Sequence, residues 1–303
     1  MEKISVIIPV FNDEKRIEKS INSVLNQTYD NLELIVINDG STDKTLEKIQ
    51  KCSDKRIKVF TQENQGTGQA RNRGLKEATG DFICFVDSDD TIELNFLETM
   101  INLIRQKEAS IVACSYKNNT GKLYELDKTE AFKYLIALPE KIPMSVVGKI
   151  FRKEKLKDLW FDKSNHFEDI KFAVEAFANA DKVVYLEKIL YNYTQREDSR
   201  SKYFKNDDRM KACLGNRELV KQKFPELIDD YITYSLFNSI AIANSMILND
   251  SYNNELLSKV KEQVQNNVES IKKSKYTVWK KWQLYLFISD FTMYKILYKL
   301  FKR

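Results

Sequence analysis

Four short apolar runs, separated by segments with helical spacing, constrain the fold of this chain more than any other feature. The runs cover residues 4–10, 32–37, 57–60 and 81–86. The first is rich in β-branched residues, as expected for a strand buried on both faces of a parallel sheet. Between the first two runs, Ile17, Ile21 and Val24 recur at the spacing of one helix face. This alternation of strand and helix predicts a doubly wound α/β fold with a mainly parallel sheet.

Polar loops follow each of the four predicted strands. They contain Phe11–Asn12, Asp39, Gly66–Arg71 and Asp87–Asp90. In an open parallel sheet, the loops at the carboxyl ends of the strands meet at one edge, where ligands bind. We therefore expect these four loops to converge on a single crevice.

The acidic run Asp87-Ser88-Asp89-Asp90 ends the fourth predicted strand. Its three carboxylates repel one another, which indicates a bound cation. Mg²⁺ or Mn²⁺ held by one or two carboxylates usually completes its shell with phosphate oxygens, so the run predicts a metal–diphosphate site. The alternative is an acidic turn that caps the next helix, predicted to begin near Glu93, and Asp90 is the residue most open to that second role.

Two further loops carry candidate ligand-binding residues. Asp39 has the chemistry to accept hydrogen bonds from a base or a ribose, or to serve only in a turn and helix cap. Arg71 and Arg73 begin a helix whose amino terminus favours anions, so they are candidates for pyrophosphate or base contact, with solvated surface arginines as the alternative. The Gly66-x-Gly68 spacing matches neither a dinucleotide fingerprint nor a Walker loop.

Asp169 is the most informative isolated acid. It follows Phe167-Glu168 in the first turn of a predicted amphipathic helix, where ordinary helix-dipole complementation is the alternative to a functional role. The lone His166 is too isolated for a catalytic triad or a zinc site, and we treat it as loop structure that leaves a ligand contact open. Further strands are predicted at 110–114 and 146–151, and residues 183–186 and 189–193 are predicted to form a closing pair of strands.

From about residue 207 the pattern is helical, which places a domain boundary near residue 205. The formal net charge of +5 is concentrated at the end, where residues 271–303 hold nine Lys or Arg and the single acid Asp290. If residues 277–303 form one helix, it is basic and amphipathic and suits an anionic membrane surface. Packing on the preceding helices or on a second subunit is the alternative, so an oligomer remains open. Nucleic acid is not an expected partner.

The cellular location is predicted from cysteine usage and from the amino terminus. Cys52, Cys84, Cys114 and Cys213 are far apart and form no C-x-x-C pair, which indicates buried thiols in a reducing compartment. We see no signal peptide, and the longest apolar run in the tail, residues 284–288, is far too short to span a bilayer. We expect a cytoplasmic protein, peripheral at the inner face of the cell membrane if the tail binds lipid.

The first part of the chain resembles glycosyltransferase family 2, inverting enzymes of the GT-A fold. The resemblance rests on ordered motifs: Val-Ile-Ile-Pro-Val-Phe-Asn at 6–12, Ser-Val-Leu-Asn-Gln-Thr-Tyr at 23–29, Asn-Asp-Gly-Ser-Thr-Asp at 38–43, Ala-Arg-Asn-Arg-Gly at 70–74 and Asp-Ser-Asp-Asp at 87–90. Downstream, Gly148-Lys149-Ile150-Phe151, Phe167-Glu168-Asp169 and Tyr191-x-Tyr193 resemble bacterial members that build surface polysaccharides. The resemblance implies a GT-A catalytic domain over residues 1–205, with a nucleotide-sugar half at 1–115, an acceptor half at 116–205 and a helical region at 206–303.

The resemblance also assigns roles to residues. It implies that Asp89 holds Mn²⁺ or Mg²⁺, that Asp169 is the base that deprotonates the acceptor, and that the nucleotide is lined by Pro9, Phe11, Asp39, Arg71, Asp87 and Ser88. We expect the enzyme to transfer a single sugar from a nucleotide diphosphate donor, a UDP-sugar, to a glycan acceptor. The hypothesis extends to an acceptor that is linked to a lipid. The Q-x-x-R-W run and membrane helices of processive members are absent from the sequence.

Two other classes of protein remain alternatives. A sugar-nucleotide pyrophosphorylase needs a G-x-G-T-R loop after its first strand, whereas this strand ends in Pro-Val-Phe-Asn. A non-catalytic module that binds nucleotide or glycan would not need Asp89 and Asp169.

Overall fold

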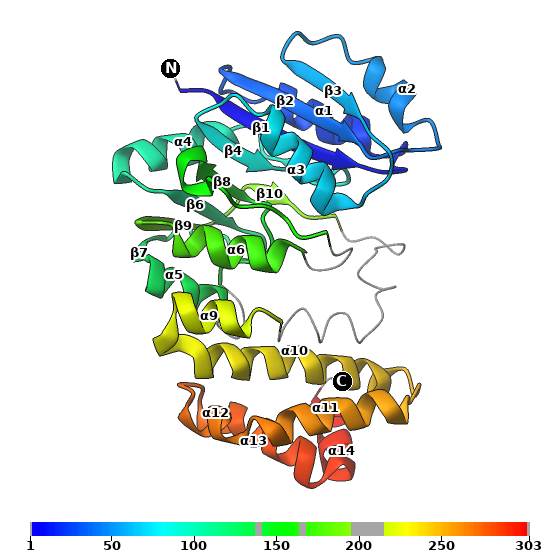
Figure 1. The fold of residues 1–303 in the computed structure, drawn as a ribbon, viewed down its shortest axis with the longest axis vertical. Helices are drawn as coiled ribbons and strands as arrows, with labels where there is room; N and C mark the ends of the chain where they lie inside the picture. Colours follow the sequence, from blue (N-terminus) through cyan, green and yellow to red (C-terminus); the bar gives the residue numbers. More distant parts are fainter. Residues whose placement is uncertain (1, 137–140, 164–167, 195–214, 302–303) are drawn as a thin grey trace. The chain divides into compact units, whose positions relative to one another are not determined.

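The computed structural model describes residues 2–136, 141–163, 168–194 and 215–301 (Figure 1). The chain divides into two compact units. One comprises Met1–Leu135 and Pro139–Glu197, and the other comprises Ile136–Leu138 and Asp198–Arg303. The boundary predicted near residue 205 falls within 195–214, outside the described residues.

The described part of the first unit is built on an eight-stranded sheet with the order β3-β2-β1-β4-β8-β6-β9-β7. The strands are β1 (Ile4–Val10), β2 (Leu32–Asn38), β3 (Ile57–Thr61), β4 (Phe82–Phe85), β6 (Ile111–Ser115), β7 (Leu123–Asp127), β8 (Lys149–Arg152) and β9 (Lys182–Ile189). β3, β2, β1 and β4 are parallel to one another, and so are β6 and β9, whereas β8 and β7 run antiparallel to their neighbours. The predicted α/β fold with a mainly parallel sheet is confirmed.

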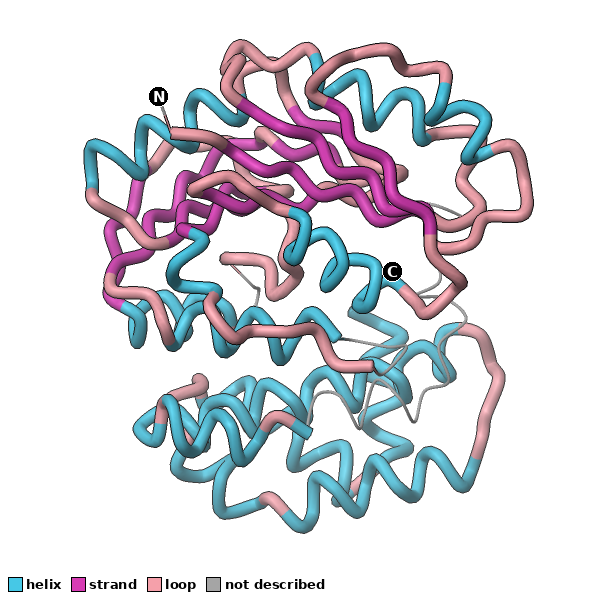
Figure 2. The backbone as a smooth tube through the Cα atoms, turned by 45° about the horizontal axis from the view of Figure 1, so that its top comes forward, coloured by secondary structure: helices cyan, strands magenta, loops and turns pink. Residues whose placement is uncertain are grey.

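Helices lie on both faces of this twisted sheet (Figure 2). They are α1 (Ile17–Leu25), α2 (Thr45–Gln50), α3 (Thr67–Glu77), α4 (Phe96–Lys107), α5 (Lys128–Leu135) and α6 (Glu168–Ala178), with a 3₁₀ turn at Lys153–Leu156. Because both faces are covered, every residue of β1 and β2 is buried. This explains why these strands appear in the sequence as continuous apolar runs rather than as alternating ones.

The structure corrects one prediction for this unit and adds two strands that were not predicted. The segments at 183–186 and 189–193 are strands, β9 and β10 (Tyr191–Asn192), but they do not pair with each other. β9 pairs with β6 and β7, while β10 pairs with the short strand β5 (Thr91–Ile92). β5 and β7 were not predicted, because β5 is only two residues long and β7 is a largely exposed edge strand.

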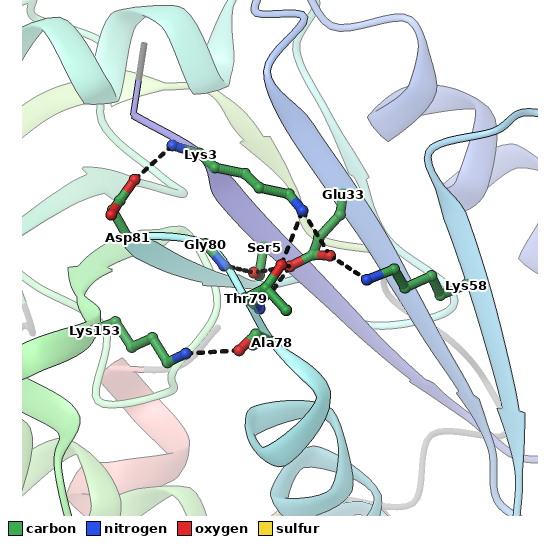
Figure 3. A network of polar contacts seen from close by, with 9 residues as sticks. All are labelled: Lys3, Ser5, Glu33, Lys58, Ala78, Thr79, Gly80, Asp81 and Lys153. Atoms are coloured by element: carbon green, nitrogen blue, oxygen red, sulfur yellow. Dashed lines mark hydrogen bonds and ion pairs between the residues drawn. The ribbon is translucent and has the colours of Figure 1, made fainter.

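A network of polar contacts closes the amino-terminal end of the parallel strands (Figure 3). Its centre is Glu33, which is 2% exposed and stands opposite Ser5 in the β1–β2 register. The Glu33 carboxylate accepts hydrogen bonds from Ser5 Oγ (2.6 Å) and from the Thr79 N–H (2.7 Å). It also accepts hydrogen bonds from the ammonium groups of Lys3 (3.0 Å) and Lys58 (2.8 Å).

The described part of the second unit is helical. Its helices are α9 (Arg217–Lys223), α10 (Ile228–Leu248), α11 (Asn254–Asn266), α12 (Val268–Lys273), α13 (Val278–Ser289) and α14 (Phe291–Phe301), with a 3₁₀ turn at Pro225–Leu227. A buried apolar cluster that includes Leu236, Val260 and Phe287 joins α10, α11 and α13. In the described ranges, no helix combines the length and the apolar character that a membrane crossing requires.

The prediction of one amphipathic helix over 277–303 is wrong in one respect. The chain breaks at Asp290, where φ is −144° and ψ is 85°, and the segment forms the two helices α13 and α14. Asp290 Oδ1 then accepts a hydrogen bond from the Met293 N–H (2.9 Å) and caps the start of α14.

Candidate active site

Hydrogen bonds and close contacts join the loops after β1, β2 and β3 at the carboxyl end of the sheet. The Asn12 side chain accepts from the Thr42 N–H (2.8 Å), and the Asn12 N–H donates to Ser41 Oγ (3.0 Å). Gly40 has a φ of +75°, and a β-carbon on it would come within 2.9 Å of the Asn64 nitrogen. These contacts join three of the four loops that were predicted to converge, and Arg71 joins the fourth through its hydrogen bond to Asp87.

The Asp39 carboxylate holds the loop that precedes α3. Its Oδ1 accepts from Gln62 Nε2 (2.8 Å) and from the Gln65 N–H (3.0 Å), and its Oδ2 accepts from the Gly66 N–H (2.8 Å). Asp39 thus fulfils a turn role at the loop after β3. The first turn of α2 is served instead by Asp43, which accepts from the Thr45 N–H (2.9 Å).

The Arg71 guanidinium bridges two carboxylates from distant parts of the chain. Nη2 donates to Asp87 Oδ1 (2.9 Å), and Nη1 donates to Glu168 Oε1 (3.2 Å). Arg71 is 5% exposed, and its buried Nε finds no acceptor among the described residues. The arginine therefore joins the acidic turn after β4 to the first turn of α6.

Close packing between α3 and α6 explains how these residues meet. The Asn72 side chain exchanges two hydrogen bonds with the backbone of Phe161 (2.8 and 2.9 Å), and the Phe161 ring stacks on Phe172 of α6 at a centroid distance of 4.1 Å. A β-carbon on Gly68 would lie only 2.9 Å from the Glu168 Cγ. Gly68 thus permits a close approach of two helices, which the sequence pattern alone did not indicate.

Asp169 lies next to Glu168 at the start of α6 and is partly buried. Burial raises the pKa of the Asp169 carboxyl to about 6; Arg71 opposes this shift, and the charges of Glu168 and Asp87 add to it. A carboxylate with a pKa closer to neutrality is a stronger proton acceptor at the pH of the cell. The structure therefore brings Arg71, Asp87 and Asp169 into one electrostatic cluster.

Ser88 and Asp13 form a buried pair beside the acidic turn. The Ser88 hydroxyl donates to Asp13 Oδ2 (2.7 Å), and Asp13 Oδ1 accepts from Arg16 Nε (2.6 Å). Asp13 was not among the predicted site residues, yet it supports the turn that carries three of them.

Asp90 does not cap the following helix, whose N-cap is Asn95. Its carboxylate is 1% exposed and accepts from the Tyr191 hydroxyl (2.7 Å) and from the Thr194 N–H (2.7 Å). The Asp87 N–H in turn donates to the Tyr191 oxygen (3.2 Å). Burial raises the pKa of Asp90 to about 7. Asp90 therefore ties β10 to the acidic turn.

The remaining predicted residues lie along the same edge of the sheet. Pro9 is buried in β1, Phe11 follows β1 and is partly exposed, and Asp89 is partly buried within the acidic turn. Over the described ranges, no three His, Cys, Asp or Glu side chains gather closely enough to hold a metal ion. A Mg²⁺ or Mn²⁺ ion that takes one or two carboxylates and otherwise phosphate oxygens needs no such group. The residues therefore fit a cation that binds together with a diphosphate.

Comparison with known families identifies the chain. The family model described as glycosyl transferase family 2 matches residues 5–180, more than half of the sequence. This chain is a family 2 glycosyltransferase. The match includes Arg71, Asp87 and Asp169 and the strands of the sheet other than β9 (Lys182–Ile189), so the predicted family and enzyme class are confirmed.

Several bacterial glycosyltransferases are similar to this family 2 enzyme. It is 34% identical over 220 residues to the glycosyltransferase GlyA of Streptococcus pneumoniae, a match that covers 66% of this chain and 32% of GlyA. It is 30% identical over 218 residues to GlyG of the same organism, covering 65% of this chain and 72% of GlyG. The chain thus aligns with only about a third of GlyA.

Solved structures show the same fold. Residues 1–349 of Staphylococcus aureus TarS, in complex with UDP-GlcNAc, superimpose with a TM-score of 0.76 at 23% identity, covering 99% of this chain and 91% of TarS 1–349. The mannosyltransferase PcManGT of Pyrobaculum calidifontis, in complex with GDP-Man and Mn²⁺, gives a TM-score of 0.60 at 15% identity, covering 99% of this chain and 86% of PcManGT. These likenesses confirm the predicted GT-A fold of the glycosyltransferase.

Sequence reasoning missed three residues that this glycosyltransferase uses to build the site. Glu168 had been noted only as a neighbour of Asp169 and Tyr191 only as part of a motif, and Asp13 was not among the candidates. A signal for Tyr191 was its place in the Tyr191-x-Tyr193 motif, whereas no local pattern indicated that Glu168 reaches Arg71. His166 lies outside the described residues.

Proposed function

We propose that this enzyme is a metal-dependent inverting glycosyltransferase that transfers a single sugar from a UDP-linked donor to a glycan acceptor. The observation that carries the proposal is the Arg71 bridge. The Arg71 guanidinium contacts Asp87 and Glu168, which belong to two distant segments of the chain. Asp89 follows in the same acidic turn as Asp87, and Asp169 is close enough for Arg71 to affect its pKa. An anionic nucleotide and the hydroxyl group of an acceptor can both bind beside these charged side chains.

The donor would lie along the carboxyl ends of β1, β2 and β4. The Arg71 guanidinium holds the Asp87 carboxylate at the edge of the donor site, and the Asp39 loop lies beside it. The residues that we assign to the nucleotide are Pro9, Phe11, Asp39, Arg71, Asp87 and Ser88. Neighbouring folds that bind UDP-GlcNAc, UDP and GDP-Man support a nucleotide-sugar donor.

In the reaction, Asp169 takes the proton of the acceptor hydroxyl. The freed oxygen forms a bond to the anomeric carbon from the side opposite the nucleotide, and the bond from that carbon to the diphosphate oxygen breaks with inversion. The proton ends on Asp169, and the nucleoside diphosphate leaves with the electron pair. General base catalysis of this kind contributes about 10²- to 10⁴-fold.

Asp89 is the residue that we assign to a divalent cation, Mn²⁺ or Mg²⁺. When bound, such an ion neutralises the charge that grows on the leaving diphosphate. The presence of Mn²⁺ in the PcManGT complex supports this cofactor.

The acceptor and the cellular setting form the finer part of the proposal. We assign residues 1–205 to the catalytic domain, with a donor half at 1–115 and an acceptor half at 116–205, and residues 206–303 to a helical domain. The acceptor is a glycan, lipid-linked and destined for a surface polysaccharide. The basic residues of 275–303 would hold the enzyme at the anionic cytoplasmic face of the membrane. We propose no role for nucleic acid.

A panel of nucleotide sugars tests the proposed reaction. Hydrolysis or transfer should occur with a UDP-sugar in Mn²⁺ or Mg²⁺, and UDP with the metal should raise the melting temperature more than either alone. Asp89→Ala should abolish the metal-dependent part of both signals. Full activity in the presence of a chelator would exclude the metal role, and stabilisation by GDP-sugars alone would exclude the UDP assignment.

A further inference from the structure

An aromatic pocket lies between α10, α13 and α14, within the helical unit. Its volume is about 390 Å³, inside the range of roughly 300–1,000 Å³ that is usual for small-molecule sites. The pocket is lined by Phe237, Ile240, Asn244, Trp279, Trp282, Gln283, Leu286, Tyr294, Leu297, Tyr298 and Phe301. None of these side chains carries a charge, so the lining suits an apolar ligand rather than a sugar, a nucleotide or an ion.

The polar groups of the lining are few, and two of them are already engaged with each other. Asn244 Oδ1 accepts a hydrogen bond from the Tyr294 hydroxyl (2.9 Å). Trp279 and Trp282 stack on each other at a centroid distance of 5.0 Å and form part of the wall. With two indole rings and no ionised group, the pocket can surround a hydrocarbon chain without leaving a buried charge unpaired.

Large apolar side chains remain exposed at the open side of this pocket. Trp279 is 55% exposed and Phe301 is 77% exposed, although both line the pocket. On the same helices, Val278, Ile296 and Leu300 are also exposed. Exposed aromatic and aliphatic side chains beside an apolar cavity are typical of a surface that meets another apolar phase.

Basic side chains occur in the same segment as this apolar surface, and one of them lies beside a residue of the pocket. The Lys280 ammonium lies 5.6 Å from the ring centroid of Phe237, which lines the pocket, and residues 271–303 carry nine basic side chains against Asp290. A second copy of the chain is a poor occupant, because a two-fold contact would set this positive surface against itself. An amphiphile with an apolar tail and a negative head complements both the pocket and its rim.

We propose that the pocket between α10, α13 and α14 binds one hydrocarbon chain of an anionic membrane lipid, with the headgroup near Lys280. This inference deepens the membrane association proposed above and rests on it. The proposal is a discrete lipid-binding site rather than general adsorption of a basic helix. The break at Asp290 matters because it places α14 beside α13, and residues of both helices line the pocket.

Tryptophan fluorescence provides the test. The chain has three tryptophans, so Trp160→Phe leaves only Trp279 and Trp282, which line the pocket. The full chain with this substitution is mixed with vesicles of phosphatidylcholine alone, or of phosphatidylcholine with phosphatidylglycerol, whose acyl chains are brominated. We expect strong quenching only with phosphatidylglycerol. A Lys280→Gln variant should weaken binding about fivefold, the effect of one basic residue near an anionic surface.

Two matched variants separate a site from adsorption. The double substitution Leu286→Phe with Leu297→Phe fills the pocket without a change in charge. It should weaken lipid binding, measured by the quenching, at least about tenfold, because two or three methylene groups of the lipid chain can no longer be buried. Leu94→Phe with Leu123→Phe adds the same two rings at exposed positions of the other unit, outside the lining, and should leave quenching unchanged. Equal quenching in the filled and control variants would overturn the proposal.

A second measurement decides the case if the filled variant does not fold. A brominated short-chain phosphatidylglycerol, kept below its critical micelle concentration, should saturate the quenching at one lipid per chain. Quenching that rises without saturation, or protection of both tryptophans in a dimer seen by light scattering, would contradict a lipid site. No sugar transfer enters these readouts, so their failure would leave the proposed reaction standing.

Discussion

Two charged clusters lie at opposite ends of the same parallel strands, and they differ in how well their carboxylates are compensated. At the amino-terminal end, burial alone would raise the pKa of Glu33, but hydrogen bonds from Lys58, Ser5, Thr79 and Lys3 hold it well below its usual value. At the carboxyl end, burial prevails, and it raises the pKa of Asp169 to about 6 and that of Asp90 to about 7.

This difference separates stability from function within one sheet. The fold favours the charged form of Glu33, so that carboxylate stabilises the protein at neutral pH. The fold disfavours the charged forms of Asp90 and Asp169, so the carboxyl end holds ionised acids at a cost in stability. Such a cost is typical of sites that use their acids in chemistry.

Asp169→Asn should have the largest effect. Because asparagine cannot accept the proton of the acceptor, transfer should fall about 10²- to 10⁴-fold, while donor affinity is kept. The melting temperature should stay the same or rise, since the substitution removes a charge that the fold disfavours. Turnover and calorimetric donor binding check this prediction, and unchanged turnover would show that Asp169 is not the base.

Glu33→Gln should reverse this pattern. The variant loses the charge that Lys3 and Lys58 pair with, and its free energy of unfolding should fall by about 3 kcal/mol, the lower end of the range for breaking a buried ion pair. The lower end applies because both lysines are partly exposed and can rehydrate. Denaturant unfolding measures this loss. The turnover of the folded fraction should match the wild type. A loss of turnover well below the melting temperature would contradict the proposal that Glu33 serves stability while the carboxyl end of the strands serves the reaction.

Arg71→Lys tests the bridge at the carboxyl end. One ammonium cannot reproduce the two contacts that the guanidinium makes to Asp87 and Glu168, so we expect a stability loss of roughly 1–3 kcal/mol and weaker donor binding. Arg73→Lys is the matched control, because Arg73 is exposed and contacts Glu77 on the same helix and the Phe60 ring rather than Asp87 or Glu168. Equal effects in the two variants would contradict the bridging role.

The pH dependence of stability should have opposite signs at the two ends. The unfolded state binds the proton of Glu33 more tightly, so the stability from Glu33 is present above about pH 4.5 and is lost as the pH falls. The folded state binds the proton of Asp169 more tightly, so stability falls as the pH rises from about 3.8 to about 6. Denaturant unfolding of each variant against the wild type, across this range, isolates the two slopes. Slopes of the same sign would refute the comparison.

The sequence predicted the parts of the fold and site that local patterns determine. Parallel strands bring their carboxyl ends together, so the positions of Asp39, Arg71 and Asp87 followed from the order of strands and helices. The contact between Arg71 and Glu168 did not follow, because it depends on how α3 packs against α6 through Phe161.

Other features escaped prediction for equally physical reasons. Glu33 lies inside an otherwise apolar strand, and only its neighbours across the sheet show that it is paired. β5 is a two-residue strand without a periodic signal, so neither β5 nor its pairing with β10 could be predicted. The break at Asp290 interrupts a stretch whose apolar spacing continues on both sides.

The pH profile of kcat/KM tests the central claim most directly, since it reports the ionisations of the free enzyme. With saturating metal, kcat/KM should fall about tenfold per pH unit below a pKa near 6, because protonated Asp169 cannot accept the acceptor proton. Asp90→Asn should keep this limb, which excludes the buried Asp90 as its source. A profile that stays flat down to pH 4.5, or a limb that disappears in Asp90→Asn, would contradict the assignment of Asp169 as the base.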